Sequence, residues 1–436
     1  MDVLRKIFGK WKERRLQRSA RWLFFVCASL VWWFLGSEIA NHYRILGILL
    51  IGAFLLETWR SWRIPVLTFH SVSSQCQWLK MPDLVVSLSS FEHNLKWLKS
   101  HGYRSLTMDE LYEVRKKNEA GNKLVALTFD DGFLDSWVAV APLLREYGLK
   151  GTVFVSTGWI EDDGPPRPQV DTISPDGIQW EGYLNPTEIR LLKNEGVLDV
   201  QSHGVTHDRI FKGGDIRAFV TDVYCPLWVY LLLYSEYRTS WYKNKFHTPP
   251  GYPIFSNGEA LAVSAFYPDP DYVKALTDTA GQKGFFDRKN WRMELMDAAD
   301  VFKRSGRELG KRETRLETLK RWREELVHSK LHLEEITGGD VSHFCWPRTA
   351  WHRKSEHLAL ECGYRSTTAG RDHNSPEEPW HVSRVHISAI GWYPLDLTRF
   401  VLEIWVFKGH YWAWPMLWII QKIILIILRY RRGILV

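Results

Sequence analysis

The sequence predicts an α/β fold in which parallel strands alternate with covering helices, and three observations support this fold class. Strand-type and helix-type segments alternate regularly between residues 64 and 202. Polar side chains directly follow two of the strands, at the ends where α/β folds usually place their functional residues. The 436 residues suffice for one large catalytic domain with appendages, because single cores tend to stop growing at ~250 to 300 residues.

The predicted elements begin with a short apolar strand, I-P-V-L-T-F, which ends before His70. Ser89 and Glu92 have capping-box spacing and predict a helix over about residues 90–101. Thr107 and Glu110 repeat this spacing for a second helix. The remaining expected elements are a strand at 124–128, a helix at 133–147, a strand at 151–156, a helix that begins at Asn185-Pro186 and a strand at 198–202.

Adjacent carboxylates follow the strand at 124–128. Asp130 and Asp131 are followed by Gly132, which can adopt the positive φ that a sharp turn needs. Asp and Gly also dominate ordinary turns, so the pair alone does not distinguish a site from a turn.

A histidine pair follows the strand at 198–202. His203 and His207 are four residues apart and could converge on one metal from a helical turn or a tight loop. With sixteen histidines in the chain, this spacing alone is weak support for a metal site. Carboxylates at one strand end and histidines at another would, however, face the same rim of an α/β barrel. Together they would offer a divalent metal two nitrogens and one oxygen, with one carboxylate to spare.

This combination resembles the polysaccharide deacetylases, the NodB-like carbohydrate esterase family 4. The resemblance rests on T-F-D-D-G at 128–132 and H-G-V-T-H at 203–207, with weaker matches in V-L-T-F-H at 66–70, F-E-H-N-L-K-W-L-K-S-H-G-Y at 91–103 and H-F-C-W-P at 343–347. It implies a deformed (β/α) barrel, expected over 64–395. It also implies an activity that removes an acyl group, usually acetyl, from an amino sugar.

The resemblance also assigns roles to residues of the site. It implies that Asp130 is the general base, and that Asp131, His203 and His207 hold a divalent metal ion, with zinc expected. The nearest match to the family's general acid is His386, for which a structural strand histidine is the alternative. We further predict substrate contacts for His70, Trp346, Pro347 and Arg348.

One position departs from the family pattern. Better-known members have an arginine two residues before the motif proline, where this chain has Cys345. Arg348 and Arg384 are the candidates to substitute for it. Trp346 is predicted to shape the sugar groove together with Pro347, although core packing is the usual position of an aromatic residue beside a strand.

The two ends of the chain predict membrane attachment. Net charges of +6 in residues 1–21 and +4 in the last fifteen, out of a total of +7, leave −3 for the middle, which argues against a nucleic-acid groove. The apolar stretch at 22–40 is long enough to cross a bilayer. The stretches at 45–56 and 411–428 are further candidates. We therefore expect a basic cytoplasmic segment at 1–21, one or two membrane helices in 22–60, and a membrane-spanning or interfacial helix in 401–436.

Two topologies are compatible with these ends. A single N-terminal crossing places the catalytic domain outside the cell, whereas a hairpin of two crossings keeps it in the cytoplasm. Arg60 and Arg63 favour the hairpin. In both cases the expected location is a membrane of the bacterial inner-membrane type, with membrane lipids as partners.

An insertion is expected at 208–338, longer than the family's barrel needs. Its apolar part, Cys225–Tyr234, is too short to cross a bilayer and predicts either a lid or a membrane-docking element. The 23 Trp and 17 Tyr favour contact with lipid headgroups. We therefore predict a metal-dependent hydrolase that removes an N-acyl group, acetyl being expected, from an amino sugar in a glycan or lipid-linked saccharide at the membrane. The alternatives are a tethered exopolysaccharide or peptidoglycan deacetylase, and an inactive glycan-binding protein on the same fold.

Overall fold

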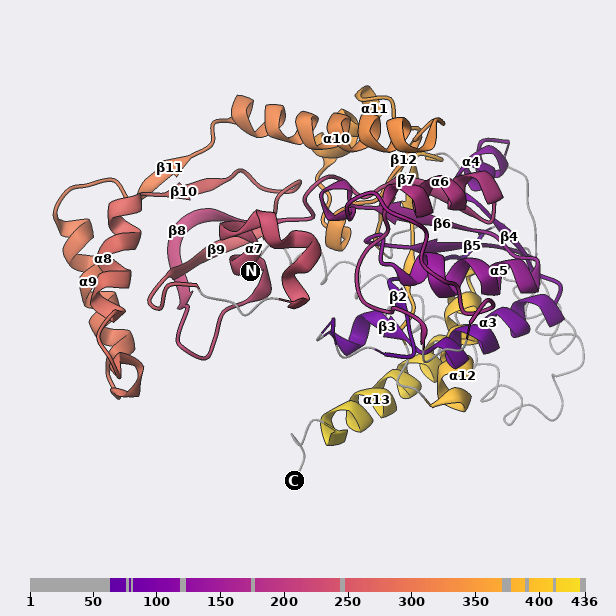
Figure 1. Ribbon diagram of the computed structural model, residues 1–436, viewed down its shortest axis with the longest axis horizontal. Coiled ribbons are helices and arrows are strands. Elements are labelled where there is room, and N and C mark those ends of the chain that lie inside the picture. Colours follow the sequence, from indigo (N-terminus) through magenta and orange to yellow (C-terminus); the bar gives the residue numbers. More distant parts are fainter. Residues whose placement is uncertain are drawn as a thin grey trace, which may run out of the picture.

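The computed structural model describes a barrel domain with a smaller unit attached to one side (Figure 1). The basic segment 1–21 and the membrane helices expected in 22–60 lie outside the described residues. The described residues are 63–75, 78–79, 81–117, 123–173, 177–243, 248–370, 378–388, 392–410 and 413–431.

The barrel is built from a nine-stranded sheet in which paired strands run parallel. Its order is β14-β13-β12-β7-β6-β5-β1-β15, with β4 also paired to β5. The strands are β1 (Val66–Phe69), β4 (Arg104–Leu106), β5 (Leu124–Phe129), β6 (Gly151–Val155), β7 (Leu198–Ser202), β12 (His343–Phe344), β13 (Ser366–Ala369), β14 (His381–Ser383) and β15 (Val385–His386). A separate short parallel pair joins β2 (Ser71–Val72) and β3 (Val85–Val86).

One stretch of chain brings the two ends of this sheet together. β14 pairs with β13 at one end of the strand order, and β15 pairs with β1 at the other. These two terminal strands are consecutive in the sequence and are separated by Arg384 alone. The sheet is therefore a nearly closed barrel of mostly parallel strands with helices around it, which confirms the expected α/β barrel.

Buried apolar runs explain the central strands. β5 reads L-V-A-L-T-F and is buried at all but its first residue, and β6 reads G-T-V-F-V and is buried throughout. Strands that are covered on both faces lose the alternation of polar and apolar residues, as these have. Leu127, Phe129 and Val153 belong to the main core.

Helices surround the barrel (Figure 1). The expected capping box at Thr107 is confirmed, and the helix expected to begin at Asn185-Pro186 does begin there, with Asn185 as its N-cap. The capping box expected at Ser89 is wrong, because Ser87 caps this helix by accepting a hydrogen bond from the Ser90 amide. The barrel helices are α3 (Leu88–Ser100), α4 (Met108–Lys116), a π-helical turn η2 (Ser136–Val140) that continues into α5 (Ala141–Tyr147), α6 (Pro186–Glu195), α10 (Arg315–Thr337) and α11 (Arg353–Glu361), with 3₁₀ turns η1 (Pro82–Leu84), η3 (Thr157–Trp159) and η7 (Pro347–Thr349).

The first part of the expected insertion forms a unit with its own core. Phe211, Phe255, Tyr272 and Leu295 are buried together in it. It contains the antiparallel pair β8 (Arg209–Phe219) and β9 (Pro253–Glu259), the antiparallel pair β10 (Phe266–Pro268) and β11 (Gly310–Arg312), and helices α7 (Leu227–Leu233), η5 (Ser235–Lys243), α8 (Pro270–Ala280), η6 (Phe285–Asp287) and α9 (Trp291–Arg304). We call residues 208–314 the inserted unit.

Helix α10 belongs to the barrel, although it lies within the expected insertion at 208–338. It packs against α6, β7 and α11, and Figure 1 shows it running from the inserted unit back along the barrel. Trp322, Leu326 and Leu333 of this helix are buried in the main core. The chain therefore leaves the barrel after β7 and returns to it through α10.

The chain ends in two further helices, α12 (Tyr393–Phe407) and α13 (Ala413–Arg431). α12 packs on α3, and α13 packs on α12 through a small apolar cluster that includes Leu402 and Leu417. Trp418, Ile419 and Ile426 of α13 are exposed. Among the described residues, no helix combines the length and apolarity needed to cross a membrane. The membrane role of 401–436 stays a prediction.

Candidate active site

Asp130 and Asp131 lie at the carboxyl end of β5 and are turned in different directions by an unusual backbone. Asp131 has a φ of 77° and Gly132 has a φ of 75°. A Cβ added to Gly132 would lie 3.0 Å from Val155 Cγ1, so glycine fits this turn both in conformation and in size. Asp130 is 3% exposed. The turn places Asp130 inside the barrel and directs Asp131 to the histidine pair.

His203 and His207 follow β7 in a loop that is held from both sides. His203 Nδ1 lies 2.8 Å from the Cys345 carbonyl oxygen, which directs Nε2 of the ring to Asp131. His207 adopts a φ of 56°. Glu325 of α10 accepts hydrogen bonds from the amides of Val205 and Thr206 at 3.1 and 2.7 Å. The histidine spacing therefore arises from a tight loop and not from a helical turn.

Asp131, His203 and His207 fit a metal ion by their geometry. The Nε2 atoms of both histidines lie 3.3 Å from Asp131 Oδ1, and this oxygen is buried without a hydrogen-bond partner. One potential ligand atom from each residue lies within 4.8 Å of the others. Burial alone would raise the pKa of Asp131, but the neighbouring imidazoles, His207 first, hold it well below its usual range. Two imidazoles and one carboxylate suit zinc or a related ion.

A second group that could bind a metal is less suitable. Asp130, His203 and Cys345 also lie close together. Asp130, however, is already paired with an arginine, and His203 Nε2 is directed to Asp131. Of the two groups, the one that contains Asp131 is therefore the better fit to a metal ion.

Asp130 is paired with Arg384, the residue that joins β14 to β15. Arg384 Nη1 and Nη2 donate to the two carboxylate oxygens at 2.7 and 2.9 Å. Burial raises the pKa of Asp130, but the Arg384 charge and then His203 lower it to about 2. Arg384 Nη2 also lies 2.9 Å from Cys345 Sγ. Of the two arginines considered for the missing motif position, Arg384 makes this contact, while Arg348 pairs with Glu259.

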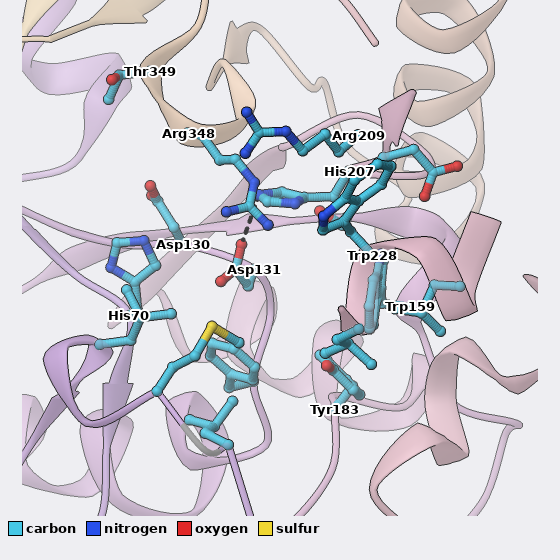
Figure 2. Close-up of a pocket in the computed structure, with 18 of the residues that line it drawn as sticks. His70, Asp130, Asp131, Trp159, Tyr183, His207, Arg209, Trp228, Arg348 and Thr349 are labelled. Carbon is cyan, nitrogen blue, oxygen red and sulfur yellow. Dashed lines mark ion pairs between the residues drawn. The ribbon is translucent and has the colours of Figure 1, made fainter. Parts of the chain in front are cut away.

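His70 and His386 lie together in the wall of the same cavity as Asp130 and Asp131, and Figure 2 labels His70. Their ring centroids are 4.9 Å apart. His386 Nε2 lies 3.2 Å from the Asp83 carbonyl oxygen. Burial, followed by the neighbouring His70, lowers the pKa of His386 to about 4. With its pKa lowered, His386 would have to take up a proton before it could act as a general acid, and that role stays a prediction.

One cavity of about 540 Å³ is bordered by Asp130, Asp131, His207, His70 and His386 (Figure 2). The inserted unit supplies part of the cavity wall. The sequence analysis did not identify which residues of the insertion would line it. The aromatic and apolar part of the wall includes Trp159 and Tyr183 of the barrel and Leu227, Trp228, Leu231 and Trp241 of the inserted unit. The only signal for this in the sequence was that the insertion starts directly after His207. The role of the insertion as a lid or as a membrane-docking element stays a prediction.

Two of the predicted substrate contacts do not reach the cavity. Trp346 is fully buried in the main core, with its ring centroid 4.7 Å from that of Phe344. Pro347 is buried at the start of η7 and is absent from the cavity wall among the described residues. Both predictions are corrected, because core packing, the alternative for Trp346, accounts for its position. His70 and Arg348 do line the cavity.

Comparisons with known proteins agree with the sequence motifs. Residues 117–221 match the family model for polysaccharide deacetylase. The chain carries a polysaccharide deacetylase domain. The match contains both Asp130 and Asp131 as well as His203 and His207, and this confirms the resemblance described from the motifs.

Curated relatives of this deacetylase domain match over a limited region. The Bacillus subtilis (strain 168) protein named "Putative polysaccharide deacetylase YxkH" is 36% identical over 104 residues, which are 23% of this chain and 34% of that protein. The poly-beta-1,6-N-acetyl-D-glucosamine N-deacetylase of Staphylococcus aureus (strain N315) is 35% identical over 78 residues, 18% of this chain and 27% of that protein. The chain thus spans about a third or less of the length of these relatives.

Solved structures of deacetylases are also similar to this chain. A de-N-acetylase from Aggregatibacter actinomycetemcomitans aligns with a TM-score of 0.48 and 14% identity, covering 78% of this chain and 99% of that one. The BpsB deacetylase domain from Bordetella bronchiseptica aligns with a TM-score of 0.46 and 15% identity, covering 75% and 97%.

Proposed function

We propose that this domain is a metal-dependent hydrolase that removes an N-acyl group, acetyl being expected, from an amino sugar. The observation that carries the proposal is the convergence of Asp131, His203 and His207 next to a second buried carboxylate, Asp130. A site with two imidazoles and one carboxylate leaves positions open on a divalent ion, as hydrolytic sites require. Zinc is the ion we propose, because it accepts imidazole and carboxylate ligands together.

The residues of the site can divide the work of amide hydrolysis. A divalent ion held by Asp131, His203 and His207 would supply Lewis-acid polarisation of the amide carbonyl and of the attacking water. Asp130, kept ionised and oriented by Arg384, accepts the proton of that water. The amine then leaves with a proton from an imidazole. We propose that His386, which lines the same cavity, first takes up a proton from solvent and then delivers it to the amine.

The substrate we propose is an N-acetylated amino sugar on a lipid carrier. The Staphylococcus aureus relative is named for a polymer of N-acetyl-D-glucosamine, which supports the amino sugar. Leu227, Trp228 and Leu231 of α7 give the cavity an apolar side that a sugar polymer does not require. The exposed Trp418, Ile419 and Ile426 on α13 support a location at a membrane of the bacterial inner-membrane type, with lipids as partners.

Two alternatives remain to be separated by experiment. The first is an exopolysaccharide or peptidoglycan deacetylase that is tethered to the membrane, and the second is an inactive glycan-binding protein. Acetate release by the full-length protein should be measured in detergent with zinc, on polyprenyl-phosphate-linked N-acetylglucosamine and on free N-acetylglucosamine oligomers. We expect a preference for the lipid-linked sugar. Preference for the free oligomer would favour the tethered enzyme, and glycan binding without acetate release would favour the inactive protein.

A further inference from the structure

Two arginines and one glutamate meet where the inserted unit touches the barrel. Glu259, the last residue of β9, lies between Arg209 of β8 and Arg348 of η7. Arg209 Nη1 is 3.7 Å from Glu259 Oε1, and Arg348 Nε is 3.4 Å from Glu259 Oε2. Both arginines line the catalytic cavity, and Figure 2 shows them beside His207. We call these three residues the arginine cluster.

The arginine cluster has more donors than it uses. Glu259 Oε2 is buried and has no hydrogen-bond partner, so its contact with Arg348 is an ion pair without hydrogen-bond geometry. Arg209 donates from Nε to Asn257 Oδ1 at 2.6 Å. Within the part of the chain that the structure describes, the Arg348 guanidinium donates no hydrogen bond. A guanidinium carries five N–H donors, so most donors of both arginines are available to a ligand in the cavity.

The charges of the cluster are also unbalanced. Two guanidinium groups share one carboxylate, which leaves an excess of one positive charge at the cavity wall. The other carboxylates of the wall are already engaged: Asp130 with Arg384, Asp131 with the histidines, and Asp208 with Arg238 at 2.6 Å. A divalent ion at the proposed metal site would add further positive charge. This side of the cavity is therefore suited to an anion.

The backbone that carries Arg348 is strained in a way that is common at functional sites. Arg348 has a φ of 53° and Thr349 a φ of 56°. Two successive residues other than glycine in this region cost on the order of 1–3 kcal/mol each, and such residues cluster at active sites and ligand clamps. The conformation places the Arg348 side chain in the cavity wall, while the preceding Trp346 is buried in the core. A side chain that only covered the surface would not need this strain.

We propose that Arg209 and Arg348 bind a phosphate group of the substrate, so that the domain deacylates an amino sugar carrying a phosphate ester close to its N-acyl group. This inference rests on the proposed function and specifies its substrate class. Two guanidinium groups can hold phosphate oxygens by paired, charge-assisted hydrogen bonds. Trp228 and Leu231 of α7 border the same cavity and would contact the hydrocarbon of a phosphodiester. Glu259 keeps the two arginines in place between ligands.

Three forms of one sugar test this proposal and separate the possible sources of the phosphate. They are the methyl glycoside of N-acetylglucosamine, N-acetylglucosamine 1-phosphate and its farnesyl phosphodiester. Binding to the full-length zinc-loaded protein is measured by calorimetry, and acetate release is measured in parallel. We expect at least about tenfold tighter binding of the 1-phosphate than of the methyl glycoside, since hydrogen bonds to charged groups contribute most to such differences. The phosphodiester should bind tightest if the phosphate belongs to a lipid carrier, whereas tightest binding of the 1-phosphate would assign a soluble sugar phosphate.

Substitutions then locate the phosphate site. Arg209→Gln should lower affinity for both phosphorylated forms by about tenfold or more, with a much smaller change for the methyl glycoside. Arg348→Asn, which tolerates the positive φ, should act in the same way. Arg217→Gln is the matched control, because Arg217 lies on the same strand with a side chain that is 66% exposed, and it should change nothing.

Several outcomes would overturn the phosphate site. These are equal binding of the methyl glycoside and the 1-phosphate, retention of the difference in Arg209→Gln, and tighter binding of an N-acetylated sugar bearing a uronate carboxylate than of the 1-phosphate. If the wild-type protein released acetate from none of the three forms, that result would instead count against the proposed function. In that case the binding differences would still decide whether the arginine cluster recognises phosphate.

Discussion

Asp130 and Arg384 form a two-point ion pair across 254 positions of the sequence, with oxygen–nitrogen distances of 2.7 and 2.9 Å. Both side chains are almost completely buried, at 3% and 4% exposure. The pair connects the proposed general base, which follows β5, with the stretch that closes the barrel. Four predictions follow from this site and its supports.

Replacing Arg384 should change the pH profile as well as the rate. Arg384→Lys keeps a charge but loses the two-point contact, so kcat should fall by roughly 10- to 100-fold, as for other residues that orient active-site groups. In Arg384→Gln the pKa of Asp130 should rise, because burial then acts without the offsetting charge. The acidic limb of the rate profile should therefore move to higher pH in the glutamine variant. A uniform loss of activity with an unchanged limb would mean that Arg384 only supports the fold.

Substitutions should show that Asp130, unlike the proposed metal ligands, is needed for activity but not for zinc binding. Asp130→Asn should lose activity by about 10²- to 10⁴-fold, the usual contribution of a general base, while zinc binding by calorimetry stays close to wild type. His203→Ala should lose both zinc binding and activity. Removing zinc from the wild type with a chelator should abolish acetate release, and adding zinc back should restore it. If Asp130→Asn lost the metal, the division of roles between the carboxylates would be wrong.

Gly132→Ala should destabilise the protein and impair the site together. The substitution forces a residue with a Cβ into a φ of 75° and into contact with Val155, at a cost of about 1–3 kcal/mol. Gly102→Ala is the control, because Gly102 has a φ of 70° but nothing within 4 Å of an added Cβ. Thermal unfolding should show the larger loss for Gly132→Ala, and Val155→Ala should rescue part of it. Equal losses would show that crowding by Val155 is unimportant.

Asp135 should make the metal-free protein less stable as the pH rises. Burial raises the pKa of this carboxyl to about 7, whereas an unfolded Asp releases its proton near pH ~4. The unfolded chain therefore loses the proton first, and stability should fall between about pH 4 and 7 by at most ~4 kcal/mol, then stay level.

Asp135→Asn should remove this fall, since an amide oxygen can still accept the hydrogen bond from Ser71 Oγ. The exposed Asp162→Asn is the control and should behave like the wild type. Urea midpoints of the metal-free protein from pH 4 to 8 would test the expectation. An unchanged pH dependence in Asp135→Asn would assign the fall to another group.

The local parts of this architecture could be predicted from the sequence because their signals are local. Thr107 and Asn185 start helices through side chains that act within one turn, and β5 and β6 are continuous apolar runs. The proximity of the motif residues Asp131 and His207 could be predicted because the carboxyl ends of parallel strands meet at one rim of a barrel. Ser89 failed as a cap because Ser87 offers the same chemistry two residues earlier.

The parts that sequence reasoning missed depend on tertiary contacts. Nothing near Arg384 in the sequence indicates that it lies between two strands at opposite ends of the sheet order. Arg209 and Glu259 meet only because β8 pairs with β9. Trp346 was assigned to the sugar groove because an aromatic residue after a strand looks the same in sequence whether it faces a ligand or the core.

The closing stretch at 381–386 has a consequence for how the domain matures. Strands β1, β5, β6 and β7 are synthesised first and could assemble while Asp130 still lacks its partner. Arg384 arrives only when β14 and β15 join opposite ends of the sheet. The barrel is therefore completed in the same step in which Asp130 gains its ion pair with Arg384. Until its last barrel strands were in place, a nascent chain would lack the contact that lowers the pKa of Asp130, and local opening between β1 and β15 would raise that pKa again.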